Sequence, residues 1–308
     1  MQSINESKFL TINNTPLFVM LKAQNINNPI LLIIHGGSSQ TANFAWFNKE
    51  LEKDFIVVYF DQRAEGKSAF DTIDTSSLTL KNYIEDIHQL TNYLKNRFKK
   101  EKIHLLGHSM GTLLGMKTIE KYPNDYISYI AVSQYVDALK NDNIAYDLLQ
   151  NDFKVNKKQL KDIQKITKDN INKLNLKRRT KKLLLLAVKH GGMLYTRSLF
   201  NFLKILIFPI FIFKKYTLKD KLNALTQNKQ RLIFYYESSL EDVIKIEIPI
   251  YFIHGKKDLV INYNLTKEYF EKIKAPKKKF ITFEKSAHFP QFEEAKKFNN
   301  LIVSLIKE

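Results

Sequence analysis

Cysteine is absent from the 308-residue chain. Its absence excludes disulfide bonds, thiolate metal ligands and a cysteine nucleophile, and it fits a reducing compartment. No basic start followed by a long apolar stretch is present either, so the sequence predicts no secretory signal and a cytoplasmic location. The most apolar run, residues 205–213, has nine residues with an internal proline. It is far shorter than the roughly 20 apolar residues needed to span a bilayer.

Acidic residues are also scarce: 31 Asp and Glu stand against 49 Lys and Arg, which gives a net charge of +18. Residues 151–182 contain twelve Lys or Arg and only three Asp, with a spacing that predicts an amphipathic helix with a basic face between Lys154 and Lys168. No recognised nucleic-acid motif accompanies this charge, so we expect no nucleic-acid partner. The remaining alternatives are a compositional habit or a weak contact with an anionic membrane surface or substrate.

Among the features that are present, the pentapeptide Gly107-His108-Ser109-Met110-Gly111 is the most informative. It follows a short apolar run, residues 103–106, and precedes a helix-like segment, residues 112–121. A serine on such a tight strand-to-helix turn is held in a strained conformation with its hydroxyl exposed, which is the geometry of a nucleophile elbow. Alone, the pattern also fits a surface turn.

A second glycine-containing turn, His35-Gly36-Gly37, follows the apolar run at residues 30–34. Backbone N–H groups at the end of a buried strand can stabilise the oxyanion of acyl transfer. We predict that the donors are Gly37 and Met110, the residue after the nucleophile. The alternative interpretation is a plain glycine turn.

Two further residues complete a candidate triad: Asp258 follows the apolar run at residues 248–253, and His288 follows the run at 280–283. The chain order Ser109, Asp258, His288 is that of the α/β-hydrolases and differs from the orders in chymotrypsin-like and subtilisin-like proteases. His288 is the expected general base and Asp258 the acid that orients it. Asp137, after the run that ends at residue 133, is the alternative acid.

These motifs resemble those of the proline iminopeptidase-like group of α/β-hydrolases over residues 5–135 and 245–305. The resemblance includes His35-Gly36-Gly37 and the turn Asp61-Gln62-Arg63-Ala64-Glu65-Gly66-Lys67-Ser68. The sequence departs from the group's pattern at Ala64, where the group has glycine, and at Ser38, where it has proline. The resemblance implies the fold and triad of a serine hydrolase but not the prolyl specificity.

Short apolar runs alternate with helical patterns at both ends of the chain and predict an α/β-hydrolase fold, with a mostly parallel, doubly wound sheet. The expected elements include a strand pair at residues 9–12 and 17–22, and helices at 44–51 and 291–306. The middle segment lacks this alternation. We therefore predict a hydrolase core at residues 1–136 and 248–308 and a helical cap at 137–247.

The cap is expected to determine the substrate. Phe208 and Phe211 are predicted to line an acyl pocket from the inner face of a lid, and the alternative is an interfacial patch that touches lipid. Trp46 and Gln134 follow sheet elements near the catalytic edge. We expect each of them either to line the substrate pocket or to belong to the core. His108, which lies next to the nucleophile, is predicted to be structural. Asp61 and Arg63 are expected to tie their own turn together.

The sequence thus predicts a serine hydrolase that acts on a small carboxylic ester through an acyl-enzyme, with neither cofactor nor metal. The alternative substrate is a short peptide that loses its N-terminal residue. That activity requires a cap carboxylate to bind the ammonium group, with Glu237, Glu241 and Asp242 as candidates. The alternative of another class is a non-catalytic binding protein with the same fold. The oligomeric state is not predicted.

Overall fold

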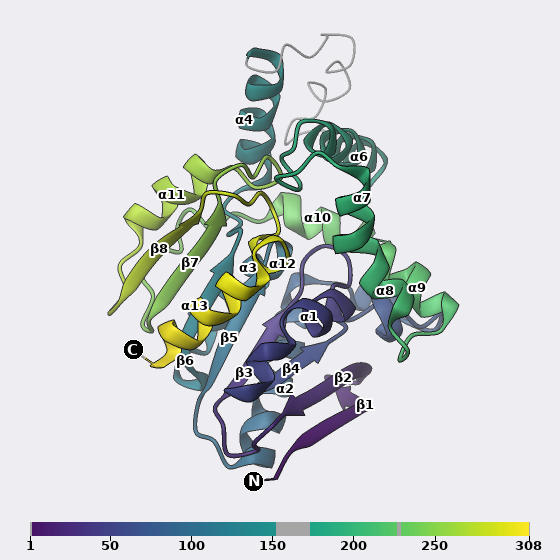
Figure 1. The fold of residues 1–308 in the computed structure, drawn as a ribbon, viewed down its shortest axis with the longest axis vertical. Coiled ribbons are helices and arrows are strands. Elements are labelled where there is room, and N and C mark those ends of the chain that lie inside the picture. The colour runs from purple at the N-terminus through teal and green to yellow at the C-terminus, as the bar shows by residue number, and fades with distance from the viewer. Residues whose placement is uncertain (1, 152–172, 227–228, 308) are drawn as a thin grey trace.

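The computed structural model describes residues 2–151, 173–226 and 229–307, and it places an eight-stranded sheet at the centre of these residues (Figure 1). The spatial order is β1-β2-β4-β3-β5-β6-β7-β8, in which β1, β2 and β4 pair antiparallel and the remaining neighbours pair parallel. The strands are β1 Ile4–Ile12, β2 Thr15–Ala23, β3 Ile30–Ile34, β4 Ile56–Phe60, β5 Ile103–His108, β6 Tyr126–Val132, β7 Ile250–Gly255 and β8 Lys278–Phe283.

Strands β3, β4, β5 and β7 are buried along their whole length because both faces of the sheet are covered. Successive side chains of a strand point to opposite faces. In β3, Leu32 and Ile34 face one apolar core, whereas Leu31 and Ile33 face the other. The first core is closed by α2 (Leu80–Phe98), α3 (Met110–Lys121) and α11 (Tyr263–Lys272), and the second by α1 (Thr41–Phe47), α12 (Pro290–Glu293) and α13 (Ala295–Lys307).

These layers are those of an α/β-hydrolase fold, as predicted, but several boundaries differ from the predicted ones. The first strand starts five residues early, at Ile4, and its turn is only Asn13-Asn14, both with positive φ. The helix expected at 44–51 is α1 followed by a 3-10 turn, Lys49–Lys53. The helix expected at 291–306 is broken at Glu294, which leaves the helical region at φ −121° and ψ 47°.

Between β6 and β7, the described residues contain helices and isolated bridges but no strand. The basic helix predicted around Lys154–Lys168 lies outside the described residues. No described helix is long and apolar enough to cross a membrane. The described helices of this segment are α4 Ala138–Asn151, α6 Lys173–Lys189, α7 Leu199–Phe202, a π turn Leu203–Ile207, α8 Phe208–Ile212, α9 Leu218–Leu225 and α10 Lys229–Glu237.

The fold brings the candidate residues together because parallel strands end at one edge of the sheet. β3, β5 and β7 run in the same direction, so their carboxyl ends lie at that edge. The loops that follow these strands carry Gly37, Ser109 and Asp258, and the loop after β8 carries His288. Figure 1 shows α10 and neighbouring helices of the segment between β6 and β7 above this edge.

Candidate active site

Ser109 occupies a sharp turn between β5 and α3, with φ 54° and ψ −122°. Such a conformation is strained for a residue with a side chain and persists only where the surroundings fix it. Two close approaches fix it here. A Cβ on Gly111 would lie 2.5 Å from the carbonyl oxygens of Ile34 and His35, and a Cβ on Gly107 would lie 2.7 Å from the Tyr129 hydroxyl. The glycines of the motif therefore let the elbow pack tightly against β3 and β6.

The side chains of Ser109, His288 and Asp258 form a continuous hydrogen-bonded chain. The Ser109 Oγ lies 2.9 Å from His288 Nε2, and His288 Nδ1 lies 2.9 Å from Asp258 Oδ2. An imidazole that donates from Nδ1 to the carboxylate leaves Nε2 free to accept the serine proton. The structure thus brings together the three side chains that the sequence placed in this order.

Asp258 is buried and its oxygens are occupied by several donors. Oδ1 accepts the backbone N–H groups of Val260 and Ile261 at 2.8 and 2.9 Å, while His254 Nε2 lies 3.3 Å from Oδ2. Burial raises the pKa of the Asp258 carboxyl, but the charge of His288 and the hydrogen bonds from both histidines outweigh it, so the pKa lies well below its usual range. The carboxyl is therefore ionised at neutral pH.

The alternative acid, Asp137, has a different environment. Its Oδ1 accepts the backbone N–H of Lys140 at 2.9 Å, and its backbone forms an isolated bridge with Ser239. These contacts place Asp137 at the start of α4, where it acts as a helix-capping acceptor. The hydrogen-bond partner of His288 is Asp258.

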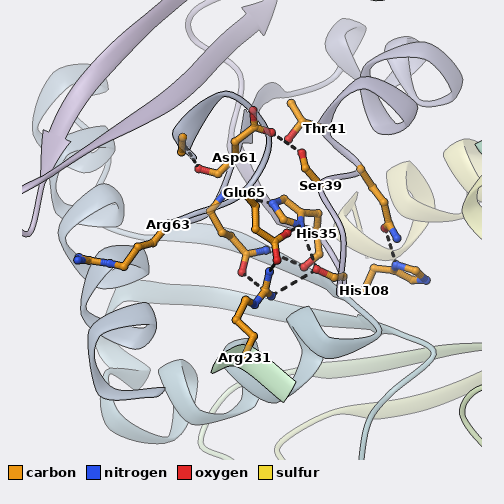
Figure 2. A network of polar contacts seen from close by, with 12 residues as sticks. His35, Ser39, Thr41, Asp61, Arg63, Glu65, His108 and Arg231 are labelled. Atoms are coloured by element: carbon orange, nitrogen blue, oxygen red, sulfur yellow. Dashed lines mark hydrogen bonds and ion pairs between the residues drawn. The ribbon is translucent and has the colours of Figure 1, made fainter. Parts of the chain in front are cut away.

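The loop after β3, residues 35–40, is held against the elbow from several sides (Figure 2). Gln62 donates its backbone N–H to the His35 ring and its side-chain amide to the His35 carbonyl. Ser39 donates to Asp61 at 2.5 Å, and Gln40 contacts the His108 ring at 2.8 Å. A Cβ on Gly36 would lie 3.2 Å from the Ser109 Cβ. The predicted donor Gly37 follows directly, and Met110 is the first residue of α3.

Arg231 of α10, which the sequence did not single out, is fully buried beneath this loop. Its guanidinium is ion-paired with Glu65 and donates to the Gly36 carbonyl at 3.3 Å and to Gln62 at 3.1 Å. Figure 2 shows Arg231 reaching from its helix to Glu65 and His35. Burial, together with the Arg231 charge, lowers the pKa of His35 to about 3, so this ring is neutral. Arg231 and Glu65 therefore join α10 to the loops that follow β3 and β4.

We expect Arg231→Met to lower the free energy of unfolding by about 3–5 kcal/mol, because it leaves the Glu65 carboxylate buried without its cation. The double variant Arg231→Met with Glu65→Gln should recover part of this loss. Urea unfolding of the two single variants and the double variant measures both effects. Additive losses in the double variant would mean that the pair is not energetically coupled.

A second contact of the segment between β6 and β7 lies at the triad itself. The Leu259 N–H donates to the Gly192 carbonyl at 3.0 Å, and the His288 N–H donates to the Met193 carbonyl at 3.2 Å. A Cβ on Gly192 would lie 2.2 Å from the Leu259 side chain. The short segment Gly192-Met193 thus braces the two loops that hold the candidate acid and base.

Glu293 links the residues just after this segment to the loop of His288. Its carboxyl accepts the backbone N–H of Tyr195 at 2.6 Å and of Ala287 at 2.8 Å. Burial raises the pKa of Glu293 to about 7 despite these hydrogen bonds. The folded chain therefore binds a proton here more tightly than the unfolded chain does.

This shift predicts a pH dependence of stability. A raised carboxyl pKa favours folding below the unfolded value near 4.5, and the contribution is lost as the pH rises through about 7. This loss should be absent in Glu293→Gln. The Tm of the variant minus the Tm of the wild type should therefore increase from pH 5 to pH 8. Thermal unfolding at several pH values tests this, with the exposed Glu284→Gln as control. Parallel profiles for Glu293→Gln and the wild type would contradict it.

The predicted substrate-binding residues occupy two different environments. Trp46, Phe208 and Phe211 lie at the surface, with about half of each side chain exposed, and the rings of Trp46 and Phe208 pack edge to face. Gln134 is fully buried, and its amide donates to the adjacent Tyr135 carbonyl. Contact of any of these four with substrate stays a prediction.

The remaining predictions concern polar residues around the site. His108 contacts Gln40 through Nδ1 and the His288 carbonyl through Nε2, at 2.8 and 3.0 Å, which is a structural role. Asp61 stabilises the turn at residues 61–68 by accepting the Lys67 N–H. Arg63, in contrast, reaches out to Asp86 on α2 at 2.6 Å. Within the described ranges, no group of three or more His, Cys, Asp or Glu could hold a metal ion.

Comparison with known proteins gives one family and several relatives. The family model described as alpha/beta hydrolase fold matches residues 29–295. The probable aminopeptidase YbaC of Bacillus subtilis (strain 168) is 30% identical over 98% of this chain and 96% of its own length. The proline iminopeptidase of Heyndrickxia coagulans is 26% identical over 87% of each chain. The solved structure of a proline iminopeptidase-related protein from Thermus thermophilus superposes with a TM-score of 0.69 at 16% identity, over 98% of this chain and 96% of that one.

Proposed function

We propose that this chain, which belongs to the α/β-hydrolase family, is a serine hydrolase that works through a covalent acyl-enzyme on Ser109. The observation that carries the proposal is the hydrogen-bonded chain from Ser109 through His288 to the ionised Asp258. This arrangement couples a strained, partly exposed hydroxyl to a base whose orientation is fixed by a buried carboxylate.

In the proposed reaction, Ser109 Oγ attacks the substrate carbonyl carbon while His288 Nε2 takes the serine proton. The backbone N–H groups of Gly37 and Met110 stabilise the resulting oxyanion. The bond to the leaving group then breaks as His288 delivers its proton to the departing atom. A water molecule, deprotonated by His288, attacks the acyl-enzyme and releases the acid, and the proton returns to Ser109.

The leading substrate class is a small carboxylic ester. It is favoured because the three carboxylates that were candidates for binding a peptide ammonium group are poorly placed. Glu241 is ion-paired with Lys140 at 2.6 Å, and Glu237 and Asp242 are exposed. An ester with no charged amine needs no such partner.

Aminopeptidase activity is the second candidate, and the relationship to the probable aminopeptidase of Bacillus subtilis favours it. A buried carboxylate suited to an ammonium group is Asp142 of α4, which accepts the Tyr236 hydroxyl at 2.7 Å. Asp142 shares the lining of a small cavity with Tyr235 of α10 and Leu259 of the Asp258 loop. It therefore replaces the three sequence candidates as the first residue to test for this activity.

A paired assay separates the two substrates. One arm measures p-nitrophenyl acetate and butyrate, and the other measures alanyl and prolyl p-nitroanilides with free and N-acetylated amines. An esterase should hydrolyse the esters through Ser109 and show no preference for a free amine. Loss of anilide hydrolysis on N-acetylation, together with a raised KM in Asp142→Asn, would instead establish the aminopeptidase. Inactivity in both arms would favour a non-catalytic binding protein.

The proposed division of the chain is a catalytic core at residues 1–136 and 248–308 with a cap at 137–247. It is supported by the described helices between β6 and β7 and by the cap contacts of Arg231, Gly192 and Met193. A cytoplasmic location remains part of the proposal and rests on the sequence alone.

A further inference from the structure

The segment between β6 and β7 exposes many large apolar side chains to solvent. Helix α7, the π turn and α8 follow one another along one flank of the molecule, and α9 lies beside them (Figure 1). We call this region the α7–α9 surface. It comprises large apolar side chains that are between 36% and 72% exposed: Leu199, Phe200, Leu203, Phe208, Phe211, Ile212, Leu218, Leu222 and Leu225.

The opposite sides of these helices hold them firmly to the core. Pro209, Ile210 and Ala224 are buried, and Asn43 donates to the carbonyls of Ile205 and Leu206 at 2.8 and 3.1 Å. Tyr216, between α8 and α9, donates to the buried Asp61 at 2.5 Å. Because the inner faces are already packed, the exposed side chains face outward and are available for another partner.

The charge of this segment restricts the partner. Between Leu199 and Leu225 the one acidic residue is Asp220, which accepts the Thr217 N–H at the start of α9, while Lys204, Lys214 and Lys215 are exposed between the apolar side chains. A second copy of the same surface would bring these lysines against one another, which is unfavourable. An apolar surface with interspersed lysines matches the acyl chains and anionic headgroups of a lipid bilayer.

We propose that the α7–α9 surface binds the surface of membranes that contain anionic lipids, with its apolar side chains in the headgroup region and its lysines against the phosphates. This binding goes beyond the proposed hydrolysis and does not depend on the identity of the substrate. It accounts for Phe208 and Phe211, whose half-exposed rings fit a lipid contact.

Sedimentation with sucrose-loaded vesicles tests the proposal. The full chain should sediment with vesicles of phosphatidylglycerol and phosphatidylcholine, and at least tenfold more weakly with phosphatidylcholine alone. The triple variant Leu199→Ser, Phe200→Ser, Leu218→Ser should require at least tenfold more anionic lipid. Lys204→Gln, Lys214→Gln, Lys215→Gln should lose most of the preference for anionic lipid.

Matched controls come from exposed positions elsewhere. Ile127→Ser, at the start of β6, and the triple variant Lys102→Gln, Lys272→Gln, Lys296→Gln remove exposed apolar and basic side chains that lie outside the α7–α9 surface, and both should bind as the wild type does. Circular dichroism checks that every variant is folded.

Absence of sedimentation of the wild type, or equal binding by the wild type and the apolar triple variant, would overturn the proposal. Self-association of the wild type without lipid would also overturn the proposal if the apolar triple variant abolished it. The surface would then bind a second copy of the chain. None of these measurements uses an enzyme assay. The test of membrane binding therefore stays valid even if the proposed hydrolysis is not found.

Discussion

Replacing Ser109 by alanine should abolish hydrolysis, with a loss on the order of 10⁶-fold in kcat as in comparable triads. The variant lacks the oxygen that attacks the carbonyl, and the half-buried hydroxyl that is removed contributes little packing. The Tm should stay within a few degrees of the wild type. Kinetics on the best substrate of the paired assay, with thermal unfolding of the same preparation, measure both quantities.

Ser133→Ala is the matched control for this variant. Ser133 also follows a parallel strand and has a positive φ of 52°, but its hydroxyl donates to the His288 carbonyl and does not contact the His288 ring. Its replacement should cost less than about tenfold, because it removes one neutral hydrogen bond. A Ser109→Ala variant with more than a few per cent of wild-type activity would place the nucleophile elsewhere.

The second large effect concerns the acid. Asp258→Asn should lower kcat by about 10⁴-fold, because an amide at this position can donate to His288 Nδ1 and so stabilises the wrong tautomer. Asp137→Asn should cost far less, since Asp137 caps α4 and has no hydrogen bond to the His288 ring.

Steady-state kinetics of the two asparagine variants, side by side, test the assignment. The control for folding is their Tm, because Asp258 also accepts two backbone N–H groups that an amide oxygen can still satisfy. Equal losses, or a greater loss in Asp137→Asn, would assign the acid to the loop after β6.

Local patterns were sufficient to predict the sheet and the meeting of Ser109, Asp258 and His288. Each residue follows a short apolar run, and parallel strands necessarily end at a common edge. These patterns did not predict where each helix and strand begins and ends. The continuous helical pattern of residues 291–306 gives no local sign of the break at Glu294, which accompanies a hydrogen bond from Ser286 to the Glu294 side chain at 2.6 Å.

The contacts between the helical segment after β6 and the rest of the chain could not be predicted, because they join segments distant in sequence. Arg231 is one basic residue among many, and nothing local shows that its partner is Glu65 or that it is fully buried. The turn at residues 61–68 offers no clear signal either, because its other acid, Asp61, is buried on neutral donors and needs no cation. The bracing of His288 by the Met193 carbonyl is a backbone contact and leaves no side-chain signature.

The most direct test of the central claim is labelling with a fluorophosphonate, followed by mass spectrometry of the modified peptide. An activated serine attacks the phosphorus, loses its proton to the base and displaces fluoride, so the wild type should carry one adduct on Ser109. Labelling should be lost in Ser109→Ala and strongly slowed in Asp258→Asn. An unlabelled wild type, or an adduct on another residue that persists in Ser109→Ala, would contradict the proposal that Ser109 is the nucleophile.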